Sequence, residues 1–292
     1  MTARVALVTA RVAAATDADL PPLLQALADA GLSPEAACWD DPEVDWSSYR
    51  LAVLRSPWDY VPRYEEFLAW LGRADRLTRV LNRPDVVRWS TDKRYLRDLA
   101  SHGVPVVPTT FFEPNGEPPS VNELAPGAGG FTDVVVKPVV SAGSKDTMRH
   151  SSRAAALGHV CDLLAAGRSV MVQPYQEAID AYGETGLVYF DGAFSHAFRK
   201  GPILRRDASP TDEFFAPEEI TARDPSSAER AVADAALAAS PHDLLYARVD
   251  LVPNSDGAPV VLELELAEPS YFVAIAPESA RRFADCVAAR LH

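Results

Sequence analysis

Short apolar runs alternate with helix-like patterns over the first ninety residues. The runs predict parallel strands, because βαβ units produce this alternation and bury both faces of a sheet. A first helix should begin near Asp19, with prolines in its first turn, and end before Gly31. We therefore predict a small doubly wound α/β domain over residues 1–90. Its expected strands are Val5–Thr9, Ala36–Trp39, Leu51–Arg55 and Thr78–Leu81, and its expected helices are Asp19–Ala30 and Tyr64–Gly72.

The pattern changes at Thr91, where a second unit of residues 91–175 is expected. Thr91 should cap a helix that runs to His102 and stops at Gly103. Proline and glycine are frequent in 113–130, which predicts a loop. Together the elements predict a compact lobe similar to a βαβ unit. Its other expected parts are an extended Val104–Phe112, strands Val134–Pro138 and Ser169–Tyr175, a loop Val140–Met148 and a helix Ser151–Ala166.

Two hairpins dominate residues 176–292. Asp191-Gly192 is a strong turn signal for the first hairpin, and Asn254–Gly257 marks the second. With two helices, the hairpins predict an antiparallel sheet covered by helices on one side. The expected fold class is thus α/β, with a doubly wound domain followed by two α+β lobes. The expected strands are Glu184–Phe190, Ala193–Lys200, Leu244–Val252 and Pro259–Leu266, and the helices are Ser227–Ala239 and Pro277–Leu291.

Composition narrows the classes of function. The net charge of -13 opposes binding to a phosphate backbone, so nucleic acid is not an expected partner. The three cysteines, Cys38, Cys161 and Cys286, have no paired spacing, which disfavours a zinc site or a disulfide framework and favours buried thiols. No apolar run reaches the length of a membrane span or of a signal-peptide core. We expect a cytoplasmic enzyme with no membrane partner.

Four charged residues of the second hairpin carry the sharpest chemical inference. A two-residue turn at positions 256 and 257 would place Asp250 opposite Glu263. The same turn would place Arg248 opposite Glu265. Because residues two apart share a face of a strand, all four side chains would project from one side of the sheet. The residues projecting from the other side would be Val249, Leu251, Leu262 and Leu264.

Three carboxylates in one patch would raise one another's pKa values unless a cation lies among them. Mg²⁺ or Ca²⁺ would relieve the repulsion, and Mg²⁺ commonly brings nucleotide phosphates as further ligands. A solvated polar face with surface ion pairs is the alternative, although the opposite face is wholly apolar. A bulge near the turn would shift the pairing by one residue. The expected metal ligands are Asp250, Glu263 and Glu265.

Lys137 ends an apolar strand and is followed by a loop of small residues, Val140–Thr147. Small residues let backbone N–H groups approach phosphate oxygens, and a lysine adds a compact positive charge. The loop lacks Walker A spacing, and a lysine at a strand end is more often simply solvated. Further along, the amide and backbone groups of Gln173–Gln176 could contact the edge of an adenine, with a plain strand exit as the alternative.

The first hairpin offers two basic residues, of which only one can reach a given site. Glu184 would lie opposite Arg199 if Asp191-Gly192 forms a two-residue turn. Lys200 would then project from the other face of the strand.

Taken in order, these motifs resemble those of the ATP-grasp superfamily. The resemblance covers nearly the whole chain, and the ordered set is more specific than any one motif. One departure is Glu265, where many members carry asparagine; a carboxylate can still ligate a metal but adds negative charge. The motifs are Lys93 in Thr-Asp-Lys, Lys137 in Val-Val-Lys-Pro, the small-residue loop, Gln173–Gln176, Arg248-Val-Asp250 and Glu263-Leu-Glu265.

The resemblance implies that residues 91–175 and 176–292 are lobes that close on ATP, with ATP and Mg²⁺ as cofactors. The two lysines would contact phosphates, residues after the last strand of the first lobe would hold adenine, and Asp180 would hold ribose. Arg248 would bind phosphate. The implied ATP-binding residues are Lys93, Lys137, Ser141, Gly143, Ser144, Gln173, Tyr175, Gln176 and Asp180.

Three further runs, 54–60, 85–89 and 196–202, resemble the O-ureido-serine cyclo-ligases of D-cycloserine biosynthesis. This implies a ligase that activates a small amino-acid-like carboxylate as an acyl phosphate and then closes a ring within one molecule. An intermolecular carboxylate–amine ligase is the alternative enzyme. A non-catalytic ATP-binding regulatory module is the alternative of another class. The oligomeric state stays open, a homodimer included.

Substrate contacts are expected from two regions. Ligands of open α/β sheets collect at the carboxyl ends of the strands, which points to Arg11 and the loop Ser56–Tyr60. Arg11 could equally be a plain surface residue. The second region lies just past the metal strand. The expected substrate-binding residues are Arg11, Ser56, Asp59, Arg199, Glu268 and Ser270, and the expected catalytic residues are Arg248 and Lys200.

Overall fold

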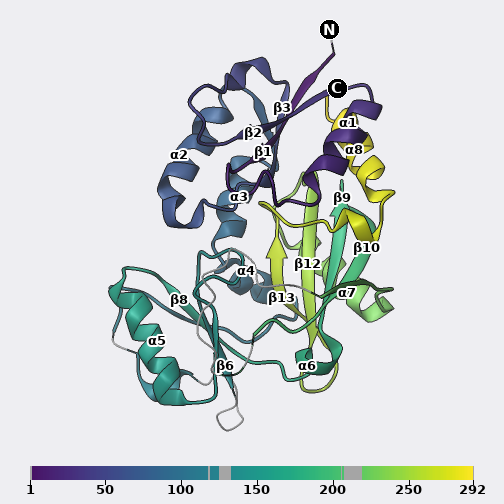
Figure 1. Cartoon of the computed structure of the whole chain (residues 1–292). Coiled ribbons are helices and arrows are strands. Elements are labelled where there is room, and N and C mark those ends of the chain that lie inside the picture. The colour runs from purple at the N-terminus through teal and green to yellow at the C-terminus, as the bar shows by residue number, and fades with distance from the viewer. Residues whose placement is uncertain (1, 118, 125–132, 205, 207–218, 292) are drawn as a thin grey trace.

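The computed structural model describes residues 2–117, 119–124, 133–204, 206 and 219–291, which contain three sheets (Figure 1). The N-terminal sheet is parallel, has the order β2-β1-β3-β4 and confirms the predicted doubly wound arrangement. Its strands lie within a few residues of the predicted ones. They are β1 (Arg4–Thr9), β2 (Ser33–Cys38), β3 (Leu51–Ser56) and β4 (Arg79–Leu81).

Helices cover both faces of this sheet. Val5 and Leu7 of β1 pack on one side with the helices α1 (Leu20–Asp29) and α8 (Ser279–Ala289). Ala6 and Val8 pack on the other side with α2 (Tyr64–Ala74). The C-terminal helix therefore returns to the N-terminal sheet, and the two ends of the chain lie near each other (Figure 1).

The segment after β4 differs from the prediction. Thr91 does not cap a helix; it is the last residue of α3 (Pro84–Thr91), and its hydroxyl donates to the Val87 carbonyl at 2.8 Å. Pro84 stands in the first turn of α3, where a proline is well tolerated. A second helix, α4 (Tyr95–Ser101), follows and ends before Gly103, whose φ of 79° favours glycine.

The first lobe contains a four-stranded sheet with the order β5-β8-β6-β7, in which all neighbours are antiparallel. Helix α5 joins β7 to β8, which flank β6, so the predicted βαβ-like unit is split by a strand. Strand β7 corrects the end of the predicted loop 140–148, and η3 (Val121–Leu124) interrupts the predicted loop 113–130, of which 118 and 125–130 lie outside the described residues. The bounds are β5 (Thr110–Phe112), β6 (Val134–Pro138), β7 (Met148–His150), α5 (Arg153–Ala165) and β8 (Val170–Pro174).

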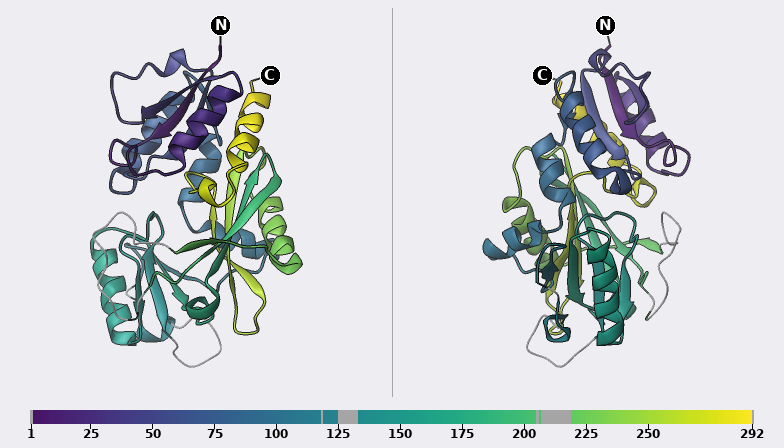
Figure 2. Two further views of the ribbon diagram at one scale, coloured as in Figure 1. Left: turned by 45° about the vertical axis from the view of Figure 1, so that its right-hand side comes forward. Right: turned by 90° about the vertical axis from the view of Figure 1, so that its left-hand side faces the viewer.

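The second lobe contains the antiparallel sheet β11-β10-β9-β12-β13. Leu187 and Tyr189 pack with α7 on one face, as predicted. Val188 and Phe190 pack with α8 on the opposite face, so helices cover parts of both sides. The two lobes lie side by side below the N-terminal sheet (Figure 2). The bounds are α6 (Ile179–Tyr182), β9 (Glu184–Phe190), β10 (Ala193–Lys200), β11 (Ile220–Ala222), α7 (Ser227–Ala238), β12 (Tyr246–Pro253) and β13 (Pro259–Glu265).

Two further findings concern the apolar length of the helices and the state of the cysteines. Among the described residues, no helix is both long and apolar enough to cross a membrane. The cysteines are free thiols, as predicted, but the expectation that they are buried is wrong: Cys38 and Cys286 are half-buried, and Cys161 is exposed on α5. Its helix turns this position towards solvent.

Gly186 of β9 gives a stability prediction. A Cβ at this position would lie 2.2 Å from the buried ring of Phe198, the residue paired with it on β10. Gly186→Ala should therefore destabilise the fold by about 1–3 kcal/mol through overpacking. Gly158→Ala is the matched control, because Gly158 lies exposed in α5 with nothing within 4 Å of an added Cβ. Urea unfolding should show the control equal to or above the parent in stability; equal losses in both variants would contradict the packing argument.

Candidate active site

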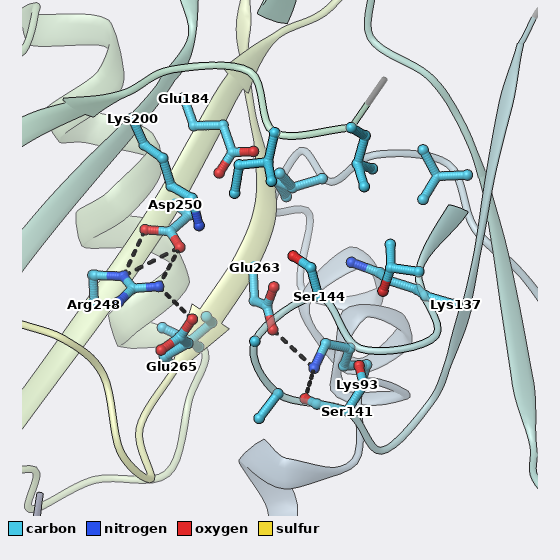
Figure 3. Close-up of a pocket in the computed structure, with 18 of the residues that line it drawn as sticks. Lys93, Lys137, Ser141, Ser144, Glu184, Lys200, Arg248, Asp250, Glu263 and Glu265 are labelled. Carbon is cyan, nitrogen blue, oxygen red and sulfur yellow. Dashed lines mark hydrogen bonds and ion pairs between the residues drawn. The ribbon is translucent and has the colours of Figure 1, made fainter. Parts of the chain in front are cut away.

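A pocket lies where the two lobes face each other (Figure 3). Its walls are the β6-β8 sheet, the small-residue loop 140–147, the charged face of the β9-β12-β13 sheet and the segment after β13. It gathers most of the residues that the sequence predicts for a site. These are Lys93, Lys137, Ser141, Gly143, Ser144, Gln173, Tyr175, Gln176, Lys200, Arg248, Asp250, Glu263, Glu265, Glu268 and Ser270.

Arg248 organises the carboxylates on this face. Its Nε donates to Asp250 Oδ1 at 2.9 Å, and its Nη2 donates to Asp250 Oδ2 at 2.8 Å. The same Nη2 also binds Glu265. Arg248 and Asp250 are only 5% and 4% exposed, so this is not the solvated polar face that was the alternative. A guanidinium fork that grips one carboxylate through two nitrogens is held in a fixed orientation.

The predicted pairing of the four charged residues is confirmed, but the turn that predicted it is wrong. The loop between β12 and β13 has five residues, 254–258, because Pro253 pairs with Pro259. This shifts the register near the turn by one, and a bulge between Asp250 and Leu251 restores Asp250 opposite Glu263. The bulge also corrects the predicted facing of Leu262, which lines the pocket beside Glu263.

Lys93 and Glu263 form the second charged pair of the pocket. The Lys93 ammonium lies 2.9 Å from Glu263 Oε1 and donates to the Ser141 carbonyl at 2.8 Å (Figure 3). Burial raises the pKa of Glu263, but the attraction of Lys93 and Lys137 outweighs it and holds the pKa below its usual range. Glu263 is therefore a carboxylate anion at neutral pH.

Lys137 faces the pocket from the end of β6 without a fixed counterion. It is 8% exposed, and within the described part of the chain no hydrogen bond or ion pair holds its ammonium. Burial, together with the neighbouring Lys93, lowers its pKa, against the attraction of Glu263. In the adjacent loop, Gly143 and Ser144 both have positive φ values, of 61° and 58°. A buried cation beside a loop of small residues is suited to an anion.

The first hairpin corrects another predicted pairing. Its register follows the Asp191-Gly192 turn as far as Phe194 and then shifts by one before His196. Lys200, not Arg199, therefore lies opposite Glu184, and both side chains line the pocket (Figure 3). Burial raises the pKa of Glu184 to about 7, against the attraction of Lys200.

Two further carboxylates of the pocket, those of Glu265 and Glu268, have raised pKa values, so a cation bound near them would be favourable. Burial and the nearby carboxylates raise the pKa of Glu265 to about 8, against the attraction of Arg248. Burial also raises the pKa of Glu268 to about 7, against a hydrogen bond from the Tyr60 hydroxyl. Among the described residues, however, no group of three His, Cys, Asp or Glu side chains is placed to hold a metal ion by itself. The predicted ligands share a pocket but do not form a complete shell of their own.

The exit of β8 forms the other end of the pocket. Gln173 is 2% exposed, and its amide nitrogen donates to Thr109 Oγ1 at 3.0 Å. The amide nitrogen of Gln176 donates to the Pro174 carbonyl at 3.1 Å. These bonds orient both side chains before any ligand binds.

Three residues predicted to bind substrate do not line this pocket. The Arg11 side chain is 76% exposed, so it behaves as a surface residue. Ser56 is fully buried and its hydroxyl lies 2.8 Å from that of Thr9. Asp59 accepts a hydrogen bond from Trp39 Nε1 at 2.7 Å. Ser56 and Asp59 thus make their contacts within the N-terminal domain.

Asp180 and Arg199 also lie outside the pocket lining. Asp180 accepts a hydrogen bond from the Tyr175 hydroxyl at 2.5 Å and lies 3.3 Å from Arg149. Arg199 donates to the Tyr182 carbonyl at 2.9 Å from the face of β10 opposite Lys200. The register shift in β10 accounts for the position of Arg199.

Aromatic residues complete the pocket in a region that was predicted only as a loop. Trp58 and Tyr60, from the predicted loop 56–60, reach the segment after β13, and Trp58 Nε1 donates to the Glu268 carbonyl at 3.2 Å. Phe272 lines the same region. Its role was not predicted, because nothing in the local pattern after β13 indicates which residues turn back to the pocket.

Comparisons with known proteins find relatives that span nearly the whole chain. Residues 5–82 match the family of the N-terminal domain of D-cycloserine synthetase DcsG. The chain is 44% identical over 298 residues to the cycloserine biosynthesis protein DcsG of Streptomyces lavendulae, with 98% of each chain covered. It resembles the crystal structure of D-cycloserine synthetase DcsG with a TM-score of 0.88, 43% identity and coverage of 99% of this chain and 100% of that one.

A more distant solved structure shares the fold. It is the ATP-grasp ligase PsnB complexed with a phosphomimetic variant of its minimal precursor, Mg and ADP. The TM-score is 0.66 at 18% identity, and the match covers 100% of this chain and 99% of that one. The two lobes that enclose the pocket therefore have the ATP-grasp architecture.

Proposed function

The chain belongs to the DcsG family of ATP-grasp ligases and is an ATP-dependent ligase of cycloserine biosynthesis, and we propose that it activates a small amino-acid-like carboxylate as an acyl phosphate. One observation carries this proposal. The buried cations Lys93, Lys137 and Arg248 and the carboxylates Asp250 and Glu263 line one pocket between the lobes. Such a pocket suits a polyphosphate accompanied by a divalent cation.

The phosphates would lie between the small-residue loop and the lysines. Lys137 is buried without a fixed counterion, so a phosphate oxygen would supply one. The adenine would lie towards Gln173 and Gln176, whose side chains are already oriented. In this arrangement the γ-phosphate points towards Arg248 and the segment after β13.

The donor set fits magnesium. Mg²⁺ prefers oxygen ligands and usually takes one or two protein carboxylates, with phosphate oxygens and water completing its shell. Asp250 and Glu263 would hold the ion, and the raised pKa of the half-buried Glu265 indicates a site that gains from added positive charge. When bound, the ion would neutralise charge on the phosphates.

Arg248 would act on the transferred phosphoryl group. A carboxylate oxygen of the substrate attacks the γ-phosphorus, the bond to the β-phosphate breaks, and ADP leaves. The Arg248 guanidinium, fixed by Asp250, stabilises the charge that develops on the phosphoryl oxygens. Lys200 would orient the same phosphates from β10, while Glu268 and Ser270 would contact the amino-acid end of the substrate.

The second step is proposed to be ring closure within one molecule. A nitrogen held in the same substrate attacks the acyl carbon and releases phosphate. Such a nucleophile acts at an effective concentration of up to about 10⁵–10⁸ M, so no second-substrate pocket is required. With O-ureido-serine as substrate, one water also cleaves the bond between the ring nitrogen and the ureido carbon, which leaves as carbon dioxide and ammonia. The products are then cycloserine, ADP, phosphate, carbon dioxide and ammonia.

The test is a screen of ADP release over amino acids and their ureido and aminooxy derivatives, supplied singly and in pairs, with mass spectrometry of the products. O-Ureido-serine alone should drive ADP release and yield the ring. If ADP is released only when two substrates are present, and the product mass equals the sum of their masses less one water, the reaction is intermolecular ligation and not ring closure.

Two lysine variants test the nucleotide site. Lys137→Ala and Lys93→Ala should each weaken ATP binding by about tenfold or more, because each removes a charge that faces phosphate. Lys145→Ala is the matched control, since Lys145 lies exposed in the same small-residue loop and does not line the pocket. Calorimetric titration with a non-hydrolysable ATP analogue measures the effect. Unchanged affinity in both pocket variants would rule out this phosphate site.

A further inference from the structure

The segment 268–273 follows β13 on the way to α8. Hydrogen bonds from other parts of the chain hold several of its backbone groups. The Glu268 carbonyl accepts from Trp58 Nε1 at 3.2 Å, and the Ser270 carbonyl accepts from Arg248 Nη1 at 3.1 Å. The Tyr271 carbonyl lies 2.7 Å from His196 Nε2. The segment carries three side chains of the pocket, those of Glu268, Ser270 and Phe272.

Asp19 holds the other side of the same segment. Its carboxylate accepts three backbone hydrogen bonds, from the N–H groups of Tyr271 at 2.7 Å, Phe272 at 3.0 Å and Val273 at 2.7 Å. Asp19 stands at the N-cap of α1, yet its side chain makes no capping bond to its own helix. The carboxylate instead binds a segment that lies 252 to 254 residues away in the sequence.

The segment takes a conformation that it would not readily adopt alone. Phe272 has a φ of 53°, in the left-handed region, where a side chain other than glycine is strained. Three N–H groups converging on one carboxylate can stabilise such a turn, because charge-assisted hydrogen bonds are among the stronger ones. Asp19 thus fixes the point at which the chain turns Phe272 into the pocket.

Arg55 joins Asp19 to the segment from the N-terminal sheet. It is 1% exposed, lies 2.8 Å from Asp17 Oδ2 and 3.4 Å from Asp19 Oδ2, and donates to the Pro269 carbonyl. Its guanidinium lies 4.7 Å from the centre of the Tyr271 ring. A buried ionic cluster is weak as a source of stability, because apolar residues of similar volume are often as good or better. A role in orientation explains it better.

We propose that Asp19 and Arg55 are positioning residues for the substrate end of the pocket. They set the backbone of 268–273, so that Glu268 and Ser270 point at the amino-acid end of the substrate while Arg248, bonded to the Ser270 carbonyl, stays aligned with the phosphoryl group. This inference rests on the proposed function, because it assigns Glu268 and Ser270 to the substrate. Neither positioning residue lines the pocket.

Asp19→Asn tests the proposal, since it keeps the size of the side chain and removes the charge. The KM for O-ureido-serine should rise by about 10- to 100-fold, as expected when a supporting residue lets a site shift by about 1 Å. The affinity for a non-hydrolysable ATP analogue should change by less than about threefold, because the lysines and the β8 exit are untouched. Arg55→Met should likewise raise the KM for O-ureido-serine and leave the affinity for the ATP analogue nearly unchanged.

Glu229→Gln is the matched control. Like Asp19, Glu229 is 5% exposed, and it accepts from a backbone N–H, that of Ser226 at 2.7 Å, and from Thr185 Oγ1 at 2.6 Å. It does not line the pocket. The control should lower the melting temperature without changing the KM for the substrate. An equal rise of KM in the control, or equal losses of substrate and nucleotide affinity in Asp19→Asn, would overturn the proposal.

Hydrogen exchange separates this inference from the proposed function. In Asp19→Asn the amides of residues 271–273 should exchange at least about tenfold faster, while those of β9 keep their protection. This measurement needs no substrate, so it stands even if the parent fails to convert O-ureido-serine. Unchanged protection of 271–273 would overturn the positioning role by itself; inactivity of the parent towards amino-acid derivatives would overturn only the proposed function.

Discussion

Asp250→Asn and Glu263→Gln are each expected to reduce turnover by about 10³-fold or more while leaving the chain folded. Each variant keeps the shape of the side chain and removes a negative charge that would ligate magnesium. Asp250 also fixes the fork of Arg248 through two hydrogen bonds, so its loss would let the guanidinium move. Circular dichroism confirms folding, and ADP release at saturating magnesium measures turnover.

Asp234→Asn is the control for these two substitutions. Asp234 is an exposed carboxylate on α7, where it accepts a hydrogen bond from the Tyr189 hydroxyl at 2.8 Å. It should retain nearly full turnover. Turnover at the parental rate in either pocket variant would exclude that carboxylate from the metal site.

Arg248→Lys is expected to lower kcat by about 10²–10³-fold, although the positive charge is kept. A lysine cannot grip Asp250 through two nitrogens and bind Glu265 and the Ser270 carbonyl at the same time. The KM for ATP should change little, because Lys93 and Lys137 remain. Steady-state kinetics with each substrate varied in turn separates the two effects.

Arg290→Lys is the control for the arginine fork. Arg290 also bridges two carboxylates, those of Asp191 and Asp243, each at 2.5 Å, but far from the pocket near the C-terminus. Its replacement should leave kcat unchanged. If Arg248→Lys retained the parental kcat as well, the guanidinium would have no part in phosphoryl transfer.

The sequence was a good guide where a side-chain pattern depends on strand period alone. The strands of the N-terminal sheet and of both C-terminal hairpins were predicted to within a few residues, because each combines an apolar run with clear turn residues. The charged cluster around Arg248 was found in the same way. Helix α3 was missed, since it is short and follows directly on β4.

Two bulges set strand registers that the pattern of polar and apolar residues did not predict. The bulge between β12 and β13 compensates for a loop that is longer than the predicted two-residue turn. The predicted pairing of Asp250 with Glu263 was therefore right although the predicted turn was wrong. The other, in β10, brings Lys200 rather than Arg199 to the pocket. A bulge shifts every later side chain to the other face, and its position leaves no mark in the alternation of polar and apolar residues.

The contacts around 268–273 could not be predicted from local sequence patterns. Asp19 and Arg55 bind backbone groups more than two hundred residues away, and hydrogen bonds to a main chain leave no partner residue to recognise. Arg11 and Ser56, which were predicted to contact substrate, do not line the pocket. They stand at the expected edge of the sheet, but the segment 268–273 and the aromatic residues of the loop 56–60 occupy the space beside the pocket.

The most direct test of the account follows oxygen from the substrate to phosphate. O-Ureido-serine labelled with ¹⁸O in both carboxylate oxygens is supplied as the only substrate with ATP and magnesium. Formation of an acyl phosphate followed by ring closure predicts one labelled oxygen in the inorganic phosphate and one in the ring carbonyl for each ADP released. Unlabelled phosphate alongside a cyclised product would contradict activation of the carboxylate by phosphoryl transfer.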